Sequence, residues 1–148
     1  PELIEQGYFT FRSGLEAATR LLDLSEPPTA IFASNDDMAA AALTVAHRRG
    51  IDVPQTLTIC GFDDTALAMT SWPELTTIRQ PITDMAQQAV ALLMREIRMR
   101  NASSKGVDHP HVVTPYTLIE RESDGPPPRR RSSNSKARSP PKRDRAFI

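Results

Sequence analysis

The sequence predicts an α/β fold in which a parallel sheet is flanked by helices. Segments of helix length, with apolar residues three and four positions apart, alternate with short apolar runs that end in polar residues. This alternation indicates parallel strands joined by right-handed crossovers. We expect two regions, a globular part over residues 1–122 and a disordered tail rich in Pro, Arg and Ser over residues 123–148.

The first half of the globular part predicts a helix, a strand and a second helix. Thr10 is a suitable N-cap for the first helix. Residues 29–33 form an apolar run of strand length, and Pro27-Pro28 separates this run from the first helix. Ser34 and Asp37 resemble a capping box for an alanine-rich helix that reaches Arg49.

The second half predicts one further strand, a long helix and an edge strand. Residues 57–62 form a continuous apolar run, typical of a strand that is buried on both faces, and residues 75–81 follow a polar segment that ends in Trp72-Pro73. Residues 82–100 have the amphipathic pattern of a helix. Residues 112–119 predict the last strand, which we place at a sheet edge because Pro115 cannot donate to a ladder.

Charge and cysteine content narrow the class of protein. Residues 124–148 hold eight Lys or Arg against two Asp, so the tail carries +6 and the rest of this neutral chain −6. The tail arginines have three interpretations: they bind nucleic-acid phosphates, they are merely solvated, or the tail is not native to the fold, as after a frameshift or an altered stop. No aromatic residues are interleaved with them. The lone Cys60 excludes an internal disulfide and indicates a reducing compartment, so we expect a cytoplasmic protein. No apolar run of membrane-spanning length is present, and we expect no membrane partner.

Two of the predicted strands end in polar residues at matching places. Asn35 lies just past residues 29–33, and Asp63 directly follows Phe62. Because the carboxyl ends of parallel strands share one edge of a sheet, these side chains should converge on one crevice. An amide donates and accepts, and a carboxylate accepts two hydrogen bonds, which suits the vicinal hydroxyls of a sugar or nucleoside. Phe9 would supply an apolar face for the ring.

Each polar residue also has a purely structural interpretation. Asn35 would cap the helix that follows it, and Asp63 would cap a short helix through residues 65–67. Cys60 lies inside an apolar run and is better explained as a small buried side chain than as a reactive thiol. Spacing alone does not decide between ligand binding and capping.

Four motifs in collinear order resemble the lactose-repressor (LacI/GalR) family of transcription regulators. They are Gly7-Tyr8-Phe9-Thr10 followed by Ser13-Gly14-Leu15-Glu16-Ala17-Ala18, Pro28 through Ala39, Cys60-Gly61-Phe62-Asp63-Asp64, and Pro73 through Pro81. The resemblance runs from about Gly7 to Glu122. It implies a periplasmic-binding-protein-like (type I) fold of two lobes with a hinged cleft. Residues 1–122 would then be the C-terminal lobe plus one crossover helix, with the second lobe incomplete.

The resemblance also implies roles for particular residues. Asn35 and Asp63 would hydrogen-bond the hydroxyls of a small-molecule effector, Phe9 would pack on it, and Gln80 would lie near the crossover between lobes. The family forms homodimers through this lobe, and the helix after Asn35 has a small, apolar face for such a contact, made of Ala40, Ala41, Leu43 and Thr44. Ordinary packing of this helix on the sheet explains the same face.

Several parts of the family pattern are missing from these residues. They are the helix-turn-helix domain, most of the N-terminal lobe, and the early strand of the C-terminal lobe with its ligand-contacting arginine. We therefore expect DNA binding only through a missing N-terminal domain. The helix over residues 82–100 would lack the sheet that it covers, and about five apolar side chains would each forgo roughly 1–2 kcal/mol. A marginal fragment with a broad melt is expected.

The sequence thus predicts the effector-binding and dimerisation part of a LacI-type regulator, in which ligand binding shifts DNA affinity. One rival is a sugar-binding protein of an ABC transporter, which has the same fold. The other rival is a carbohydrate-active enzyme that uses Asp63 and Asp64. Adjacent strand residues point to opposite faces, and none of the three histidines follows a strand. We therefore expect no enzyme activity, no cofactor and no metal.

Overall fold

The structure is a computed structural model that describes residues 3–102, 111–126 and 145–148. It divides into two compact units. The first comprises residues 1–79 and 118–148, and the second comprises residues 80–117. The predicted helices are all present, and the predicted strands lie where expected but are shorter.

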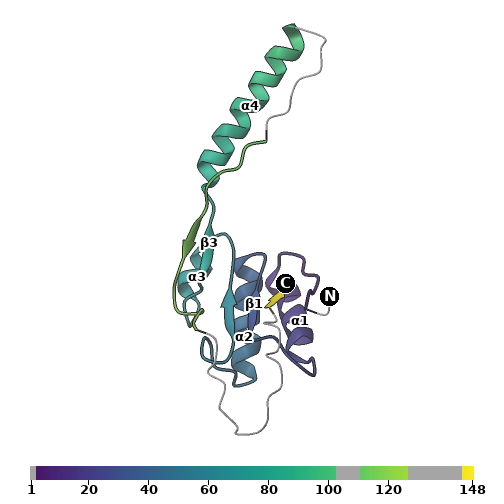
Figure 1. The fold of residues 1–148 in the computed structure, drawn as a ribbon, viewed down its shortest axis with the longest axis vertical. Helices are drawn as coiled ribbons and strands as arrows, with labels where there is room; N and C mark the ends of the chain where they lie inside the picture. Colours follow the sequence, from purple (N-terminus) through teal and green to yellow (C-terminus); the bar gives the residue numbers. More distant parts are fainter. Residues whose placement is uncertain (1–2, 103–110, 127–144) are drawn as a thin grey trace, which may run out of the picture. The chain divides into compact units, whose positions relative to one another are not determined.

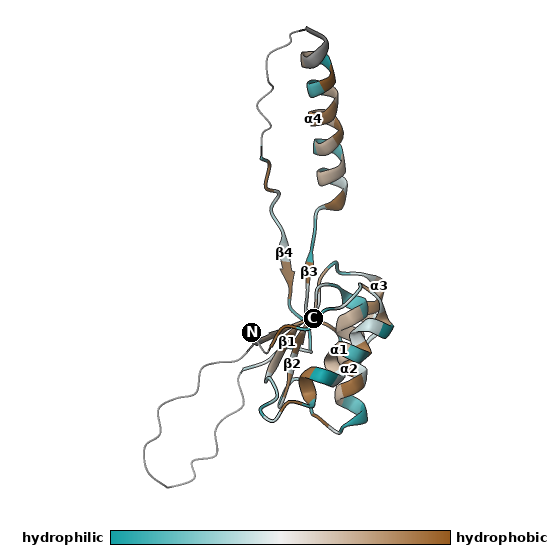
Figure 2. Ribbon diagram, turned by 90° about the vertical axis from the view of Figure 1, so that its right-hand side faces the viewer, coloured by the Kyte–Doolittle hydropathy of each residue, from teal (hydrophilic) through white to brown (hydrophobic). Residues whose placement is uncertain are grey.

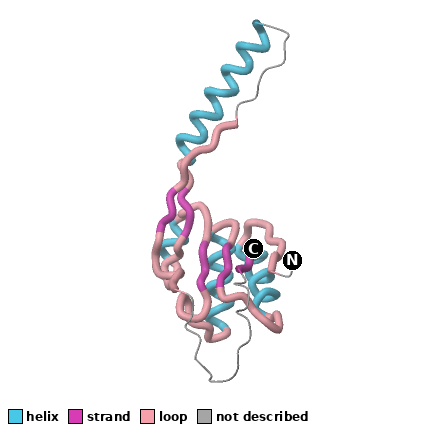
Figure 3. Tube along the Cα trace, viewed as in Figure 1, coloured by secondary structure: helices cyan, strands magenta, loops and turns pink. Residues whose placement is uncertain are grey.

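The first unit is built on a parallel sheet with the strand order β2–β1–β5. Its strands are β1 (Ala30–Phe32), β2 (Thr58–Cys60) and β5 (Arg145–Phe147), and Figure 3 shows β1 and β2 as neighbours. A parallel bridge between Cys60 and Thr76 continues the sheet toward β3 (Thr77–Arg79). β3 pairs with β4 (Thr117–Ile119), so the strand predicted over residues 112–119 is confined to its last part.

Two helices cover one face of this sheet. α1 (Phe11–Leu22) and α2 (Asp36–Arg48) lie side by side there, as Figures 1 and 2 show. Thr10 is the N-cap of α1, because its hydroxyl accepts a hydrogen bond from the Ser13 N–H at 3.2 Å. The predicted cap is therefore confirmed.

The strands bury one face and leave the other partly open. Ile31 and Ile59 belong to the core that α1 and α2 cover, and both are at most 1% exposed. Phe32 and Cys60 alternate with them and are only half-buried. On that second face the Phe32 ring makes edge contacts with Phe62 and Phe147, at centroid distances of 6.5 and 5.9 Å. The expectation that the strand over residues 57–62 is buried on both faces is therefore wrong.

The predicted tail contains ordered residues at both of its ends. Ser123 is fully buried, its hydroxyl donates to the Ile59 carbonyl at 2.6 Å, and it accepts from the Thr76 N–H at 2.8 Å. Residues 145–147 form β5, a strand of the sheet. The prediction of disorder is thus wrong at 123–126 and 145–148, because the sheet supplies partners that composition does not reveal. Residues 127–144 lie outside the described residues, and the domain boundary at 122 stays a prediction.

The second unit contains the long helix α4 (Ile82–Ala102), which confirms the predicted helix. Its apolar residues are largely exposed in the described chain, including Val90 at 60% and Leu93 at 57%. Among the described residues, no helix combines the length and the apolarity that crossing a membrane requires.

Candidate functional site

The carboxyl edge of the parallel sheet brings the predicted binding residues to one side of the first unit. Phe32 of β1 pairs in register with Cys60 of β2. Asn35 and Asp63 follow these two paired residues by the same number of positions. Both residues therefore lie at the same sheet edge, as the sequence predicts.

Asn35 joins two elements at this edge. It is the N-cap of α2, because its side-chain oxygen accepts a hydrogen bond from the Met38 N–H at 2.9 Å. The residue is only 8% exposed. Its side-chain amide donates to the Phe9 carbonyl at 3.1 Å. The predicted capping box of Ser34 and Asp37 is wrong, since the Ser34 hydroxyl donates instead to the Ile148 carbonyl at 2.8 Å.

Phe9 presents its ring to solvent from the loop before α1. The residue is 66% exposed, and its φ of 57° lies in the left-handed region, which a bulky side chain seldom adopts. The hydrogen bond from Asn35 holds its carbonyl. The structure thus brings together Phe9 and Asn35, two residues that are far apart in sequence.

Asp63 also has an unusual backbone conformation. Its φ is 108°, and the φ of Asp64 is 57°, while the Asp63 N–H donates to the Ile78 carbonyl at 2.9 Å. In the described residues, Phe9, Asp63 and Asp64 are the non-glycine residues with positive φ. Such conformations cost about 1–3 kcal/mol each and cluster at ligand sites. Thr65 occupies the N-cap position of α3 (Ala66–Thr70) and makes no side-chain capping bond, and the capping interpretation of Asp63 stays a prediction.

Asp36 holds this edge of the sheet together, a role that the sequence does not predict. It is fully buried; one carboxylate oxygen accepts from the Thr77 hydroxyl at 2.6 Å, and the other accepts from the Thr65 N–H at 2.7 Å. A Cβ at Gly61 would clash with this carboxylate, so the close approach requires glycine there. Asp36 therefore ties α2 to the loop after β2 and to β3.

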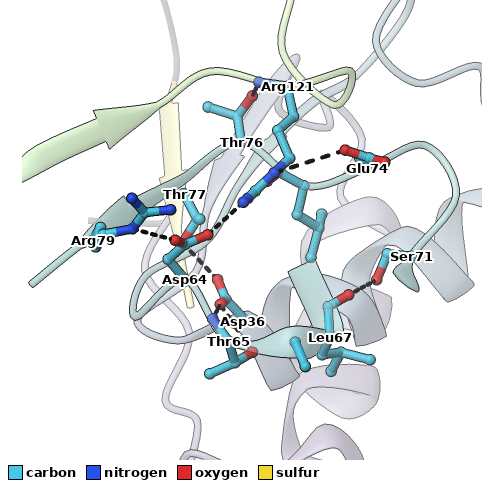
Figure 4. Close-up of polar contacts among 12 residues, drawn as sticks. Asp36, Asp64, Thr65, Leu67, Ser71, Glu74, Thr76, Thr77, Arg79 and Arg121 are labelled. Carbon is cyan, nitrogen blue, oxygen red and sulfur yellow. Dashed lines mark hydrogen bonds and ion pairs between the residues drawn. The ribbon is translucent and has the colours of Figure 1, made fainter. Parts of the chain in front are cut away.

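Asp64 is the centre of an ion-pair network (Figure 4). Its side chain is only 6% exposed and contacts Arg79 and Arg121, each at 2.5 Å. Arg121 also donates to the Leu75 carbonyl at 2.7 Å and lies 3.8 Å from Glu74. Burial raises the pKa of Asp64, but the hydrogen bonds and charges of the two arginines outweigh it and lower the pKa below its usual value. The sequence suggests Asp64 only as a residue of the rival enzyme, and no local signal predicts Arg121 as its partner.

Cys60 is a structural side chain. Burial, followed by the nearby Asp124 carboxylate, raises the pKa of its thiol to about 11. The thiol is therefore neutral near pH 7 and a poor nucleophile. In the part of the chain that the structure describes, no three His, Cys, Asp or Glu side chains are grouped to hold a metal ion.

The remaining predicted residues lie elsewhere. Gln80 directly follows β3 and is the first residue of the second unit. The predicted dimer face on α2 is mostly used inside one chain, since Ala40, Ala41 and Leu43 are at most 7% exposed. A Cβ at Gly14 would lie 2.8 Å from the Ala41 Cβ, so Ala41 packs against α1. Packing within the fold accounts for these three residues, Thr44 is half-buried, and dimerisation stays a prediction.

Comparison with known proteins identifies the family of the chain. Residues 3–123 match the periplasmic binding protein-like domain. The HTH-type transcriptional repressor CytR of Escherichia coli K12 is 42% identical over 104 residues, which are 70% of this chain and 30% of that protein. A LacI transcriptional regulator from a Rhodococcus species has a solved structure that is 34% identical, with a TM-score of 0.67, and the match covers 83% of this chain and 43% of that one.

A second solved structure contains a ligand. It is the complex of the transcriptional regulator CelR with cellobiose, 33% identical, with a TM-score of 0.68, and the match covers 79% of this chain and 34% of that one. The chain spans about a third of the length of the curated relatives that it matches. The four motifs of the sequence lie within the matched residues, and the parallel sheet has the expected order of elements. The chain therefore belongs to the periplasmic binding protein-like family, and solved structures that it resembles are LacI-type regulators.

Proposed function

We propose that the edge formed by Phe9, Asn35 and Asp63 binds a small-molecule effector rich in hydroxyl groups, of the sugar or nucleoside class. The observation that carries the proposal is the strained backbone at Phe9, Asp63 and Asp64. Strain of this kind persists only where the surrounding structure enforces it, and ligand clamps are a common reason for it. Here the bonds of Asn35 to Phe9 and of Asp63 to Ile78 enforce it.

The chemistry of the three side chains suits such a ligand. The Asp63 carboxylate accepts hydrogen bonds from vicinal hydroxyls, and such charge-assisted bonds are stronger than neutral ones. Asn35 uses one amide hydrogen and one lone pair within the protein, and its amide group has a further hydrogen and lone pair for a ligand. The exposed Phe9 ring packs on the apolar face of the sugar or base.

The relatives support a proposal for the function of the whole protein. They are named as transcriptional regulators, and cellobiose is the ligand in the CelR complex, which favours a regulator that senses a sugar over a transport protein. Effector binding would shift the equilibrium between lobe arrangements and so change DNA affinity. DNA contact would come from a domain outside these residues, and the protein would act as a homodimer in the cytoplasm without enzyme activity.

The direct test is a titration of the 148-residue chain, followed by amide NMR shifts, with a panel of monosaccharides, disaccharides and nucleosides up to millimolar concentration. One ligand class should shift the amides of Phe9, Asn35 and Asp63. Asp63→Asn should weaken binding of that ligand at least tenfold, which corresponds to about 1.4 kcal/mol.

The matched control is Asp52→Asn. Asp52 is exposed and precedes β2, so it lies at the opposite end of that strand from Asp63. This variant should bind the ligand as the unaltered chain does. The proposal is wrong if Asp63→Asn binds with unchanged affinity, or if the shifts map to residues away from this edge.

A further inference from the structure

β5 is an internal strand of the sheet, although it comes from the far end of the chain. On one side it pairs with β1, and the Ile148 N–H donates to the Phe32 carbonyl at 2.9 Å. On its other side it pairs with the segment before α1: the Phe147 N–H donates to the Leu3 carbonyl at 3.0 Å, and the Glu5 N–H donates to the Phe147 carbonyl at 3.1 Å. Two separate backbone edges therefore form a groove that β5 fills.

The side chains of the strand match this groove. Ala146 is fully buried and Ile148 is 3% exposed, and both belong to the core cluster that includes Ile31. Phe147 points to the other face, where it is 47% exposed and contacts the Phe32 ring. The groove thus selects a small residue at 146 and a large apolar residue at 148, and it tolerates variation at 147.

The strand is also anchored at its carboxyl end. The Ile148 carbonyl accepts from the Ser34 N–H at 2.6 Å and from the Ser34 hydroxyl at 2.8 Å. Ser34 directly precedes Asn35, the N-cap of α2. The occupant of the groove therefore contacts the turn that leads from β1 into α2.

We propose that the groove between β1 and the Leu3–Glu5 segment is a docking site for an extended peptide strand, and that residues 145–148 of this chain are its exchangeable occupant. Addition of a strand to exposed backbone edges is a general mode of peptide recognition, with affinity from main-chain bonds and specificity from pockets for alternate side chains. Residues 127–144, rich in Pro, Arg and Ser, connect this occupant to the fold.

Covalent attachment favours the chain's own strand over a competitor. Because docking of the attached strand is an intramolecular step, a free peptide of the same sequence competes poorly with it. A change that expels the tethered strand opens the groove to that peptide. Because occupancy does not involve the proposed effector, failure of this inference is distinguishable from failure of the proposed function.

The test uses the full chain and a fluorescent peptide with the sequence of residues 141–148, read by anisotropy. Ala146→Arg in the full chain places a long charged side chain at a fully buried position and should expel the tethered strand. This variant should bind the peptide at least tenfold more tightly than the unaltered chain does. Phe147→Leu is the matched control, because its half-exposed position leaves docking intact, and it should bind as weakly as the unaltered chain.

Peptide that itself carries Ala146→Arg should bind none of the three chains. Equal binding of both peptides to the Ala146→Arg chain would overturn the proposal. A second measurement holds even if that variant fails to fold. In the unaltered chain, hydrogen exchange at the Phe147 and Ile148 amides should be slowed about a hundredfold relative to the free peptide. Exchange as fast as in the free peptide, with the Ile59 amide still protected, would show that the strand does not dock.

Discussion

α2 and α4 are both amphipathic helices, yet only α2 is covered by the rest of its unit. Ala41 of α2 is fully buried between α1 and the body of its unit, whereas Val90 and Leu93 of α4 are 60% and 57% exposed. An apolar side chain gains about 1.5–3 kcal/mol only when it is removed from water. The first unit therefore has a core of its own, and the described residues of the second unit do not provide one.

The first unit is also held together by a network of polar groups. In the first unit, the buried carboxylates of Asp36 and Asp64 bind the loop after β2, β3 and Arg121. Among the described side chains, no buried polar atom is without a hydrogen-bond partner. The unit that carries the proposed site is thus fixed by both its core and its polar network, which is what a site with a strained backbone requires.

The largest expected effect comes from deleting apolar volume in each unit. Ile59→Ala in β2 should lower the free energy of unfolding by about 4 kcal/mol, because Ile59 is fully buried in the core. Leu93→Ala in α4 should change it by less than about 0.5 kcal/mol, because the side chain is already exposed. Urea denaturation followed by circular dichroism measures both values. A loss at Leu93 as large as that at Ile59 would mean that the face of α4 is covered.

The second effect concerns the polar network. Asp64→Asn removes a charge that two arginines share and should lower the free energy of unfolding by about 2–3 kcal/mol at pH 7. The pKa of Asp64 is lowered in the folded chain, so its ionised form stabilises the fold above the unfolded pKa near 3.8. This contribution is lost as the pH falls through the folded pKa.

The pH profile therefore provides the control. The difference in stability between the unaltered chain and Asp64→Asn should be constant from pH 5 to pH 7 and should shrink as the pH falls below about 4. Asp37→Asn is the matched variant, because Asp37 is exposed, and its effect should be small at pH 7. A difference at Asp64 that stays constant down to pH 2 would contradict the assigned ion pairs.

Local patterns in the sequence predict most of this fold. Apolar spacing locates α1, α2 and α4, and hydroxyl chemistry identifies the Thr10 cap. Long-range pairings are not encoded locally. The short strand at residues 145–147 has too few residues for a period and lies in a basic tail, so composition predicts disorder where the sheet imposes order.

The candidate site likewise has features that the sequence predicts and features that it does not. Strand ends predict that Asn35 and Asp63 share an edge, because topology alone determines it. The hydrogen bond from Asn35 to Phe9 and the contacts of Asp64 with Arg79 and Arg121 depend on tertiary packing, and no spacing rule predicts them. The positive φ of Phe9 is likewise not predictable from the sequence, since phenylalanine seldom adopts it.

Phe9 gives the smallest expected effect and separates two kinds of exposed apolar residue. Phe9 and Leu93 are similarly exposed, but only Phe9 has a backbone in the left-handed region. Glycine adopts this region without the cost of roughly 1–2 kcal/mol that other residues incur, although its freedom in the unfolded chain offsets part of the gain. Phe9→Gly should therefore be more stable than Phe9→Ala by less than about 1 kcal/mol in urea denaturation, while both variants lose affinity for the effector.

At Leu93, which is helical, the order should reverse, with Gly about 1 kcal/mol less stable than Ala. The same order at both positions would mean that Phe9 is not strained.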